Sequence, residues 1–246
     1  MAFRVAEDPE VLTPVMICSD AFIVSHTDEP VDAPDQEEVD AYLPPYRPAD
    51  FMDVDNPKTF CAGVAPDGYM EVKYQQQLAI QRSAGVIRRA CREFAGRFGR
   101  DYGDLVEEYR CDGARAVLVA LGSSAGTARE VVDRLREEGL AAGLLRVRSF
   151  RPFPADEIRR VARNAGAIGV LDRDVSYGYE GAVFSEVKAA LYGQETAPPV
   201  LNFVAGLGGR DITAGDIREM FVKILEAQGR APAEGNSVEF VGVRLG

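Results

Sequence analysis

The chain from about residue 113 onward alternates apolar runs with segments in which apolar positions recur at helical spacing. The apolar runs are continuous, which is typical of strands buried on both faces of a sheet, and they lie at 115–123, 141–150, 167–174 and 198–209. The helical segments follow at 127–139, 154–166, 181–193 and 213–229. This order predicts an α/β fold with an open parallel sheet covered by helices on both faces. A last apolar run at 237–245 predicts an edge strand or an arm that lies on another chain.

The first part of the chain has a different pattern. Residues 13–25 form one apolar run, interpreted as a lone strand without a sheet partner. Residues 30–66 are rich in Pro and Asp and have little periodicity, so they predict an extended segment packed on something else. A long helix is predicted at 71–98. We therefore divide the chain into residues 1–112, with the extended segment and linking helix, and residues 113–246, the α/β domain.

Composition narrows the classes of function. The 246 residues carry 28 basic and 39 acidic side chains, a formal net charge of −11, which disfavours nucleic acid and anionic membranes as partners. The amino terminus lacks a signal-peptide pattern and no apolar run reaches membrane-spanning length, so a cytoplasmic location is expected. Four widely spaced cysteines and a single histidine argue against a metal site, an iron–sulfur cluster or a Ser-His-Asp hydrolase in this chain.

Candidate site residues lie in turns that follow the predicted strands, where open parallel sheets bind ligands and partners. The first turn contains Gly122, Ser123, Ser124 and Thr127 and can serve either as an anion-binding turn or as an interface turn. It lacks the lysine of a P-loop, which favours the interface interpretation.

Two charged clusters follow later strands. Asp172, Arg173 and Asp174 can act in acid–base chemistry or as an ion-pair latch, and the latch is favoured because no histidine lies nearby in sequence. Arg210 and Asp211 repeat the pattern and are expected to pair across to this loop. His26, followed by Thr27, is interpreted as a capping or interface histidine.

Several successive motifs resemble one family. They are DAFIVSHTDEPV, YLPPYRP, GYMEVKYQQQLAI, LGSSAGTAREVVDRLREEG, GLLRVRSFRPFP, GVLDRDVSYGYEGAVFSEV and FVAGLGGRDIT. Together they are similar to the alpha subunit of pyruvate:ferredoxin oxidoreductase and related 2-oxoacid:ferredoxin oxidoreductases. The resemblance covers nearly the whole chain and implies a transketolase C-terminal-like α/β domain over residues 113–230.

The resemblance also implies an activity and a set of partners. The family decarboxylates a 2-oxoacid oxidatively to acyl-coenzyme A and CO2 with reduction of ferredoxin, or runs the reverse reaction, with thiamine diphosphate, Mg²⁺, [4Fe-4S] clusters and coenzyme A. This chain is expected to begin at the last strand of the pyrimidine-binding domain, so residues 1–112 are interpreted as its remnant. No catalytic residue is carried over, and no cofactor or metal is expected on this chain alone. The cofactors are expected on thiamine-diphosphate-binding, cluster-bearing and pyrimidine-domain chains.

The hypothesis is therefore a structural and interface component of such an enzyme, acting on ferredoxin only indirectly. Two alternatives stay open. One is a free-standing, non-catalytic interaction module of the same fold. The other is a small-molecule or nucleotide-binding α/β domain that uses the turns of residues 122–127 and 206–211.

Overall fold

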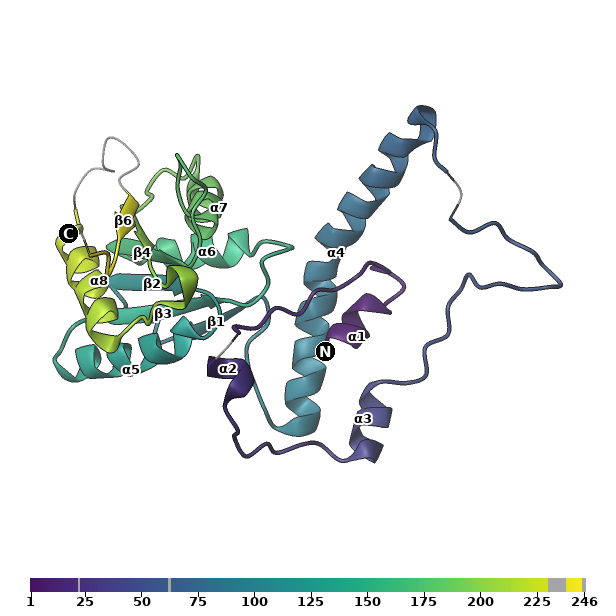
Figure 1. Cartoon of the computed structure of the whole chain (residues 1–246), viewed down its shortest axis with the longest axis horizontal. Coiled ribbons are helices and arrows are strands. Elements are labelled where there is room, and N and C mark those ends of the chain that lie inside the picture. Colours follow the sequence, from purple (N-terminus) through teal and green to yellow (C-terminus); the bar gives the residue numbers. More distant parts are fainter. Residues whose placement is uncertain (22, 62, 230–237, 245–246) are drawn as a thin grey trace. The chain divides into compact units, whose positions relative to one another are not determined.

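The chain forms two compact units. The computed structural model describes residues 1–21, 23–61, 63–229 and 238–244. One unit contains Met1–Cys18 and Thr27–Asp104, and the other contains Ser19–His26 and Leu105–Gly246 (Figure 1). The second unit starts at Leu105, before the expected boundary at residue 113, because a short strand missed from sequence joins its sheet. It also includes a segment from the amino-terminal part of the chain.

The second unit is built on a six-stranded sheet in the order β1-β3-β2-β4-β5-β6. All neighbouring pairs are parallel except β1 with β3, so the predicted mostly parallel sheet is confirmed. The last run forms an edge strand that pairs with β5, and its end at residue 245 lies outside the described residues. The strands are β1 (Val106–Tyr109), β2 (Ala116–Ala120), β3 (Ala142–Val147), β4 (Ala167–Asp172), β5 (Val200–Val204) and β6 (Val238–Phe240).

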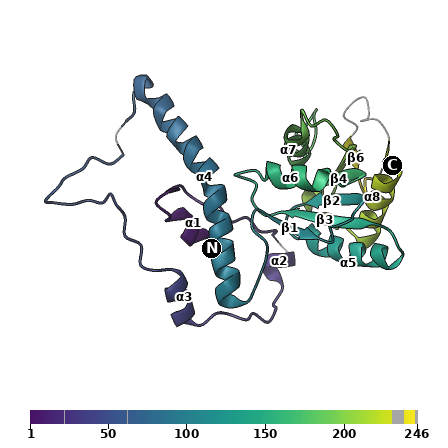
Figure 2. The same ribbon diagram turned by 180° about the vertical axis from the view of Figure 1, so that it is seen from behind.

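Helices cover both faces of this sheet, as the alternating pattern predicts. On β2, Leu118 belongs to the core under α5 and α8, whereas Val117 and Val119 belong to the core under α6 and α7. Both faces are buried because successive strand side chains point to opposite sides. Figure 2 shows the same layers from behind. The helices are α5 (Ser124–Glu137), α6 (Ala155–Ala162), α7 (Ala182–Leu191) and α8 (Ala214–Glu226), with a 3-10 turn η1 (Leu207–Gly209) before α8.

Local signals in the sequence set the helix ends. The Thr213 side chain accepts a hydrogen bond from Asp216 N–H, and the Asp216 carboxylate accepts one from Thr213 N–H, forming a capping box at the start of α8. Gly139 has a φ of 82° just after α5, a left-handed conformation that glycine adopts without strain. The helix ends predicted from the ranges 127–139 and 213–229 agree with the observed end of α5 and start of α8.

The first unit is built around one long helix, α4 (Pro66–Phe98). The predicted helix at 71–98 is confirmed and extends five residues further toward the amino terminus, with Pro66 in the first turn, where its missing N–H costs nothing. A small core of Val5, Val11, Val86 and Ala90 joins the amino-terminal segment to this helix. The other helices of the amino-terminal part are α1 (Ala2–Ala6), α2 (Ile23–His26), which belongs to the second unit, and α3 (Gln36–Tyr42).

The strand interpretation of residues 13–25 is wrong. Residues 13–21 have no regular secondary structure, and Ile23–His26 forms a single helical turn. Met16 and Ile17 are 88% and 79% exposed, unlike the apolar side chains of a strand that is buried in a sheet. A strand needs a hydrogen-bonded neighbour, and an apolar sequence alone does not supply one.

A substitution at Gly169 tests the packing of α8 on the sheet. An added Cβ would clash with Ile224 Cδ1 and would lie 2.9 Å from Phe203 Cε2. Gly169→Ala is therefore expected to lower the free energy of unfolding by about 1–3 kcal/mol through overpacking. Gly126→Ala in α5 is the matched control, because nothing lies within 4 Å of its added Cβ and alanine favours a helix. Urea unfolding that ranks the two variants in the opposite order would contradict this packing.

Candidate functional site

The turn between β2 and α5 holds a carboxylate from the same chain. The backbone N–H of Ser123 donates to Asp20 Oδ2 at 2.6 Å. Gly122 has a φ of 64°, and a Cβ there would lie only 2.8 Å from the same oxygen, so glycine lets the carboxylate approach the turn closely. The turn does bind an anionic group, but this group is a side chain of Ser19–His26.

Arg173, just after β4, holds the other side of this carboxylate. Its Nη1 lies 2.6 Å from Asp20 Oδ1. The position for a Cβ on Gly206, after β5, is 3.1 Å from Arg173 Nε. Parallel strands deliver their carboxyl ends to one edge, so the turns after β2, β4 and β5 meet there, as expected from their sequence positions. We call Asp20, Ser123 and Arg173 the carboxylate seat.

The seat favours the ionised form of Asp20. Burial alone would raise the pKa of this carboxyl, but hydrogen bonds from the Ser123 hydroxyl and N–H, together with the charge of Arg173, outweigh it and lower the pKa. The α5 amino terminus adds its positive dipole end next to the carboxylate. The seat therefore anchors Ser19–His26 on the carboxyl edge of the sheet by charge as well as by hydrogen bonding.

Asp172 precedes Arg173 of the seat in the chain, but its side chain binds the start of α7 and not Asp20 or Ser123. Its side chain is 1% exposed and accepts hydrogen bonds from Val183 N–H at 2.9 Å and Phe184 N–H at 3.1 Å. The N–H groups in the first turn of a helix have no carbonyl partner within the helix, so Asp172 supplies the acceptor for two such groups of α7. Asn202 on β5 donates to the same carboxylate at 3.2 Å and accepts from Gly181 N–H at 3.1 Å. Asp172 is therefore a buried helix cap, and the expected ion-pair latch is wrong for this residue.

Burial acts strongly on this carboxyl. Removal from water, together with the charge of Asp174 nearby, raises the pKa of Asp172 to about 6 even though the three hydrogen bonds act to lower it. The carboxyl is thus mostly ionised at neutral pH and becomes protonated in mild acid.

A second buried carboxylate neighbours Asp172 along the chain. Glu180 is fully buried and lies 2.6 Å from Lys188 Nζ and 2.8 Å from Ser185 Oγ, both on α7. Lys188 also lies over the Phe184 ring at 4.8 Å. Glu180 is not among the residues expected from sequence. It fixes the end of the loop from Arg173 to the start of α7.

The other residues expected from the 122–127 turn are structural in their contacts. Ser124 is buried and its hydroxyl donates to the Leu121 carbonyl at 2.8 Å. Thr127 is half-buried in the first turn of α5. Neither contact reaches the Asp20 carboxylate.

The two charged pairs do not meet as expected. Asp174 accepts from Ala182 N–H at 3.3 Å, which adds a second carboxylate to the start of α7. Arg210 is exposed and donates to the Gly242 carbonyl rather than to the loop after β4. Asp211 next to it is exposed. The predicted pairing with residues 172–174 is wrong for Arg210, because its guanidinium binds Gly242 while the Asp172 and Asp174 carboxylates accept N–H groups of α7.

His26 and Thr27 are exposed at the end of α2. The Ser25 hydroxyl and His26 Nδ1 lie 2.9 Å apart. His26 is on the segment that Asp20 anchors, so its expected role at an interface stays a prediction.

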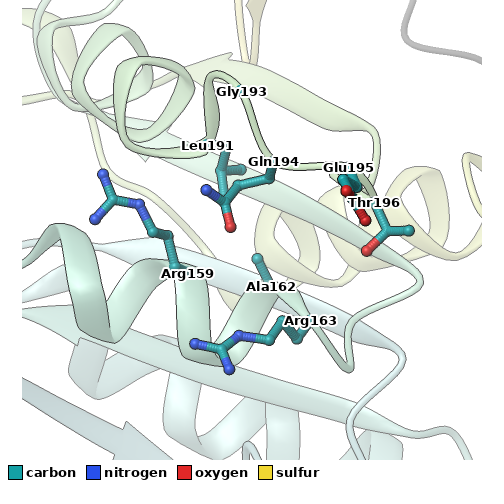
Figure 3. A pocket seen from close by; sticks show the side chains of 8 residues that line it. All are labelled: Arg159, Ala162, Arg163, Leu191, Gly193, Gln194, Glu195 and Thr196. Atoms are coloured by element: carbon teal, nitrogen blue, oxygen red, sulfur yellow. The ribbon is translucent and has the colours of Figure 1, made fainter.

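A pocket of about 310 Å³ is lined by none of the seat residues (Figure 3). It is formed where α6 and α7 end and the chain returns to the start of β5. Arg159 and Arg163 line it on one side, and the loop after α7 lines the other with Gln194, Glu195 and Thr196. The Arg159 guanidinium is already bound to the Ala190 carbonyl and to Asp156. The pocket is polar and open and is remote from the turns where an open parallel sheet binds ligands.

None of the His, Cys, Asp and Glu side chains in the described part of the chain form a group of three that could hold a metal ion. No described helix is both long and apolar enough to cross a bilayer.

Two family models match this chain. The model for the pyruvate flavodoxin/ferredoxin oxidoreductase thiamine-diphosphate-binding region matches residues 1–92. The model for core domain II of pyruvate:ferredoxin oxidoreductase matches residues 114–217, which carry most of the sheet and the seat residues Ser123 and Arg173.

Curated relatives extend the match to nearly the whole chain. Pyruvate synthase subunit PorA of Methanothermobacter thermautotrophicus is 49% identical over 89% of this chain, and that of Pyrococcus horikoshii is 42% identical over 99%. The chain belongs to the alpha-subunit family of the pyruvate and 2-oxoacid:ferredoxin oxidoreductases. The resemblance inferred from the sequence motifs is thus confirmed.

Members of this alpha-subunit family differ in their named substrates and in length. The ketoisovalerate oxidoreductase subunit VorA of Pyrococcus abyssi is 42% identical over 92% of the chain. The chain spans 56–62% of the length of the three relatives named here.

Removal of the Asp20 charge tests the seat. Asp20→Asn is expected to lower the free energy of unfolding by about 1 kcal/mol, as for other lost helix caps, and to speed hydrogen exchange at Ser123 N–H. Glu219→Gln, on the exposed face of α8, is the control. Unchanged exchange at Ser123 in Asp20→Asn would contradict the seat as an anchor.

The pKa of Asp172 predicts a pH-dependent stability. The folded pKa of about 6 lies above the ordinary value of 3.8, so the folded chain binds this proton more tightly than the unfolded chain. The stability that Asp172 contributes is therefore full below pH 4 and is lost as the pH rises through 6. The unfolding free energy of the native chain minus that of Asp172→Asn should fall by roughly 2–3 kcal/mol between pH 4 and 6.5. A constant difference across this range would refute the shift.

Proposed function

We propose that this chain is a component of the alpha subunit of a thiamine-diphosphate-dependent 2-oxoacid:ferredoxin oxidoreductase. The assembled enzyme would convert a 2-oxoacid and coenzyme A to acyl-coenzyme A and CO2 while reducing ferredoxin, or run the reverse reaction. The identity of 40–49% with pyruvate synthase alpha subunits over nearly the whole chain carries this proposal. It favours pyruvate over a branched 2-oxoacid, since the most similar of the named relatives is a pyruvate synthase subunit.

The chain acts in this proposal as a scaffold for the active site and not as a source of catalytic groups. The carboxyl edge of its sheet is built from polar turns whose charged groups are occupied within the chain, as in the pairing of Asp20 with Arg173. Such an edge can present a rigid surface to a neighbouring chain. Ser19–His26, held there by Asp20, carries the exposed residues Val24 and His26 on that edge.

The residues described here do not fit a thiamine diphosphate site. A diphosphate with its Mg²⁺ needs a group of oxygen ligands, and no such cluster of carboxylates exists in the described part of the chain. The turn between β2 and α5 at the carboxyl edge binds Asp20. The diphosphate, the iron–sulfur clusters and coenzyme A are therefore proposed on other parts of the assembled enzyme. A cytoplasmic complex is proposed with them.

The seat also bears on the nucleotide-binding alternative. A phosphate on the Gly122 turn would have to displace the Asp20 carboxylate and leave Arg173 without its partner. This cost favours the interface role of the turn. Saturable binding of a nucleotide or coenzyme A by the purified chain alone would reverse the preference.

Affinity capture of the chain from cells that produce it tests the proposal. Mass analysis is expected to identify a thiamine-diphosphate-binding chain, a cluster-bearing chain and a chain with the pyrimidine-binding domain. The captured complex should reduce ferredoxin with pyruvate in a reaction that needs coenzyme A. Activity with 2-oxoisovalerate in place of pyruvate separates the two substrate classes.

The reaction should depend on this chain. Complex assembled without it is expected to lose activity at least about tenfold, because the active site would lack one wall. Recovery of the chain alone, at monomer size and without cofactor, would sink the proposal and favour the free-standing interaction module.

A further inference from the structure

The pocket of about 310 Å³ where α6 and α7 end has a lining that matches one class of small molecule. Arg159, Ala162 and Arg163 form one wall, and their spacing of three and four residues places them on one face of α6. The end of α7 and the turn that follows it form the other wall. We call this cavity the α6–α7 pocket.

Contacts within the chain hold both walls in place. Arg159 Nε donates to the Ala190 carbonyl at 2.8 Å, which ties α6 to the end of α7. Its Nη1 donates to Asp156 Oδ1 at 2.8 Å. On the other wall, Gln194 N–H donates to the Leu191 carbonyl at 3.1 Å and fixes the turn. The pocket is therefore preformed, and a ligand does not have to order its walls.

Two opposite charges in the α6–α7 pocket are available to a ligand. The Arg163 guanidinium and the Glu195 carboxylate are exposed, and neither forms an ion pair or a side-chain hydrogen bond within the described part of the chain. Figure 3 shows the Arg163 guanidinium and Glu195 toward opposite ends of the pocket. Because these charges line one cavity without pairing with each other, they suit the two ends of a single ligand.

The surroundings of these charges favour a zwitterion over a simple anion. A guanidinium offers parallel N–H groups that match a carboxylate. The helices α6 and α7 both end at the pocket, and the partial negative charge of a helix carboxyl end attracts a cation and opposes an anion. A ligand with a carboxylate for Arg163 and an ammonium group for Glu195 satisfies both charges and the helix ends.

The rest of the lining limits the size and polarity of the ligand. Ala162 and Leu191 are buried and give the α6–α7 pocket an apolar floor. Its volume of about 310 Å³ lies at the small end of the range for ligand pockets. A small molecule with a short apolar group fits this floor.

We propose that the α6–α7 pocket binds an α-amino acid with a short apolar side chain. The ligand carboxylate binds Arg163, its ammonium group binds Glu195, and its side chain lies on Ala162 and Leu191. This inference goes beyond the proposed function and does not depend on it, because it rests on the pocket of this chain alone.

Titration of the purified full chain with L-valine tests the proposal. Amide chemical shifts at residues 191–196 are expected to change and to saturate with a dissociation constant of about 1 mM or tighter. Two matched compounds each lack one end of the zwitterion. They are 2-oxoisovalerate, which has no ammonium group, and isobutylamine, which has no carboxylate. Each should bind at least about tenfold more weakly than L-valine, because one charged contact is lost.

Substitutions separate the two ends of the site. Arg163→Gln and Glu195→Gln are each expected to weaken L-valine binding at least about tenfold. Glu195→Gln should not weaken the binding of 2-oxoisovalerate, which has no group for this carboxylate. Arg134→Gln on α5 and Glu219→Gln on α8 remove exposed charges outside the pocket and should leave the affinity unchanged.

Three results would overturn the proposal. They are no saturation by L-valine up to about 10 mM, equal affinity for L-valine and 2-oxoisovalerate, and native affinity in both pocket variants. Equal affinity would show a carboxylate contact only. The unfolding midpoint of each variant should match that of the native chain, since both side chains are exposed, so that a lost affinity reports on the ligand contact.

Discussion

The start of a helix leaves backbone N–H groups that need acceptors, and this requirement organises the carboxyl edge of the sheet. Four helices start there after a parallel strand, and at three of them the backbone N–H groups are met by an acidic side chain of this chain. Asp20 binds at the start of α5, Asp172 caps α7, and Asp216 completes the capping box of α8. At these three helices the edge that offers anion sites in other parallel sheets is therefore satisfied internally.

Because the N–H groups at these helix starts already have acceptors within the chain, the carboxyl edge is better suited to contact a neighbouring chain than to bind a ligand. A diphosphate would compete with carboxylates that already have hydrogen bonds and, for Asp20, an ion pair at 2.6 Å. The surroundings of Asp20 and Asp172 shift the pKa values of the two carboxyls in opposite directions. Asp20 is half-exposed and stabilised as an anion, whereas Asp172 is buried and has a pKa of about 6. Burial dominates at Asp172 and raises its pKa, whereas at Asp20 the Ser123 hydrogen bonds and the Arg173 charge outweigh burial and lower the pKa.

The sheet domain could be derived from sequence because its signals are local. Continuous apolar runs, helical spacing and the Thr213 cap depend on neighbours within a few residues. The seat could not be derived, since Asp20 and Ser123 are separated by 103 positions and nothing in the spacing links them. The one usable signal was that Asp20 is the only charged residue in the apolar run 13–25. The apolar pattern of this run predicts a strand, whereas its one charged residue, Asp20, is where the segment contacts the sheet domain.

The two units differ in what stabilises them. The sheet domain has a large apolar core on each face, while the core of the first unit joins only four buried residues with Ile87 alongside. Such a core offers little hydrophobic stabilisation to offset the conformational entropy that a helix of 33 residues and the 35 residues from 27 to 61 lose on folding. The amino-terminal turns of α4 add exposed apolar side chains, among them Tyr69, Met70 and Tyr74. Contact with a partner would bury these groups and supply the stabilisation that the first unit lacks. Assembly and order in the first unit are therefore expected to be coupled, with the sheet domain as the part that is stable by itself.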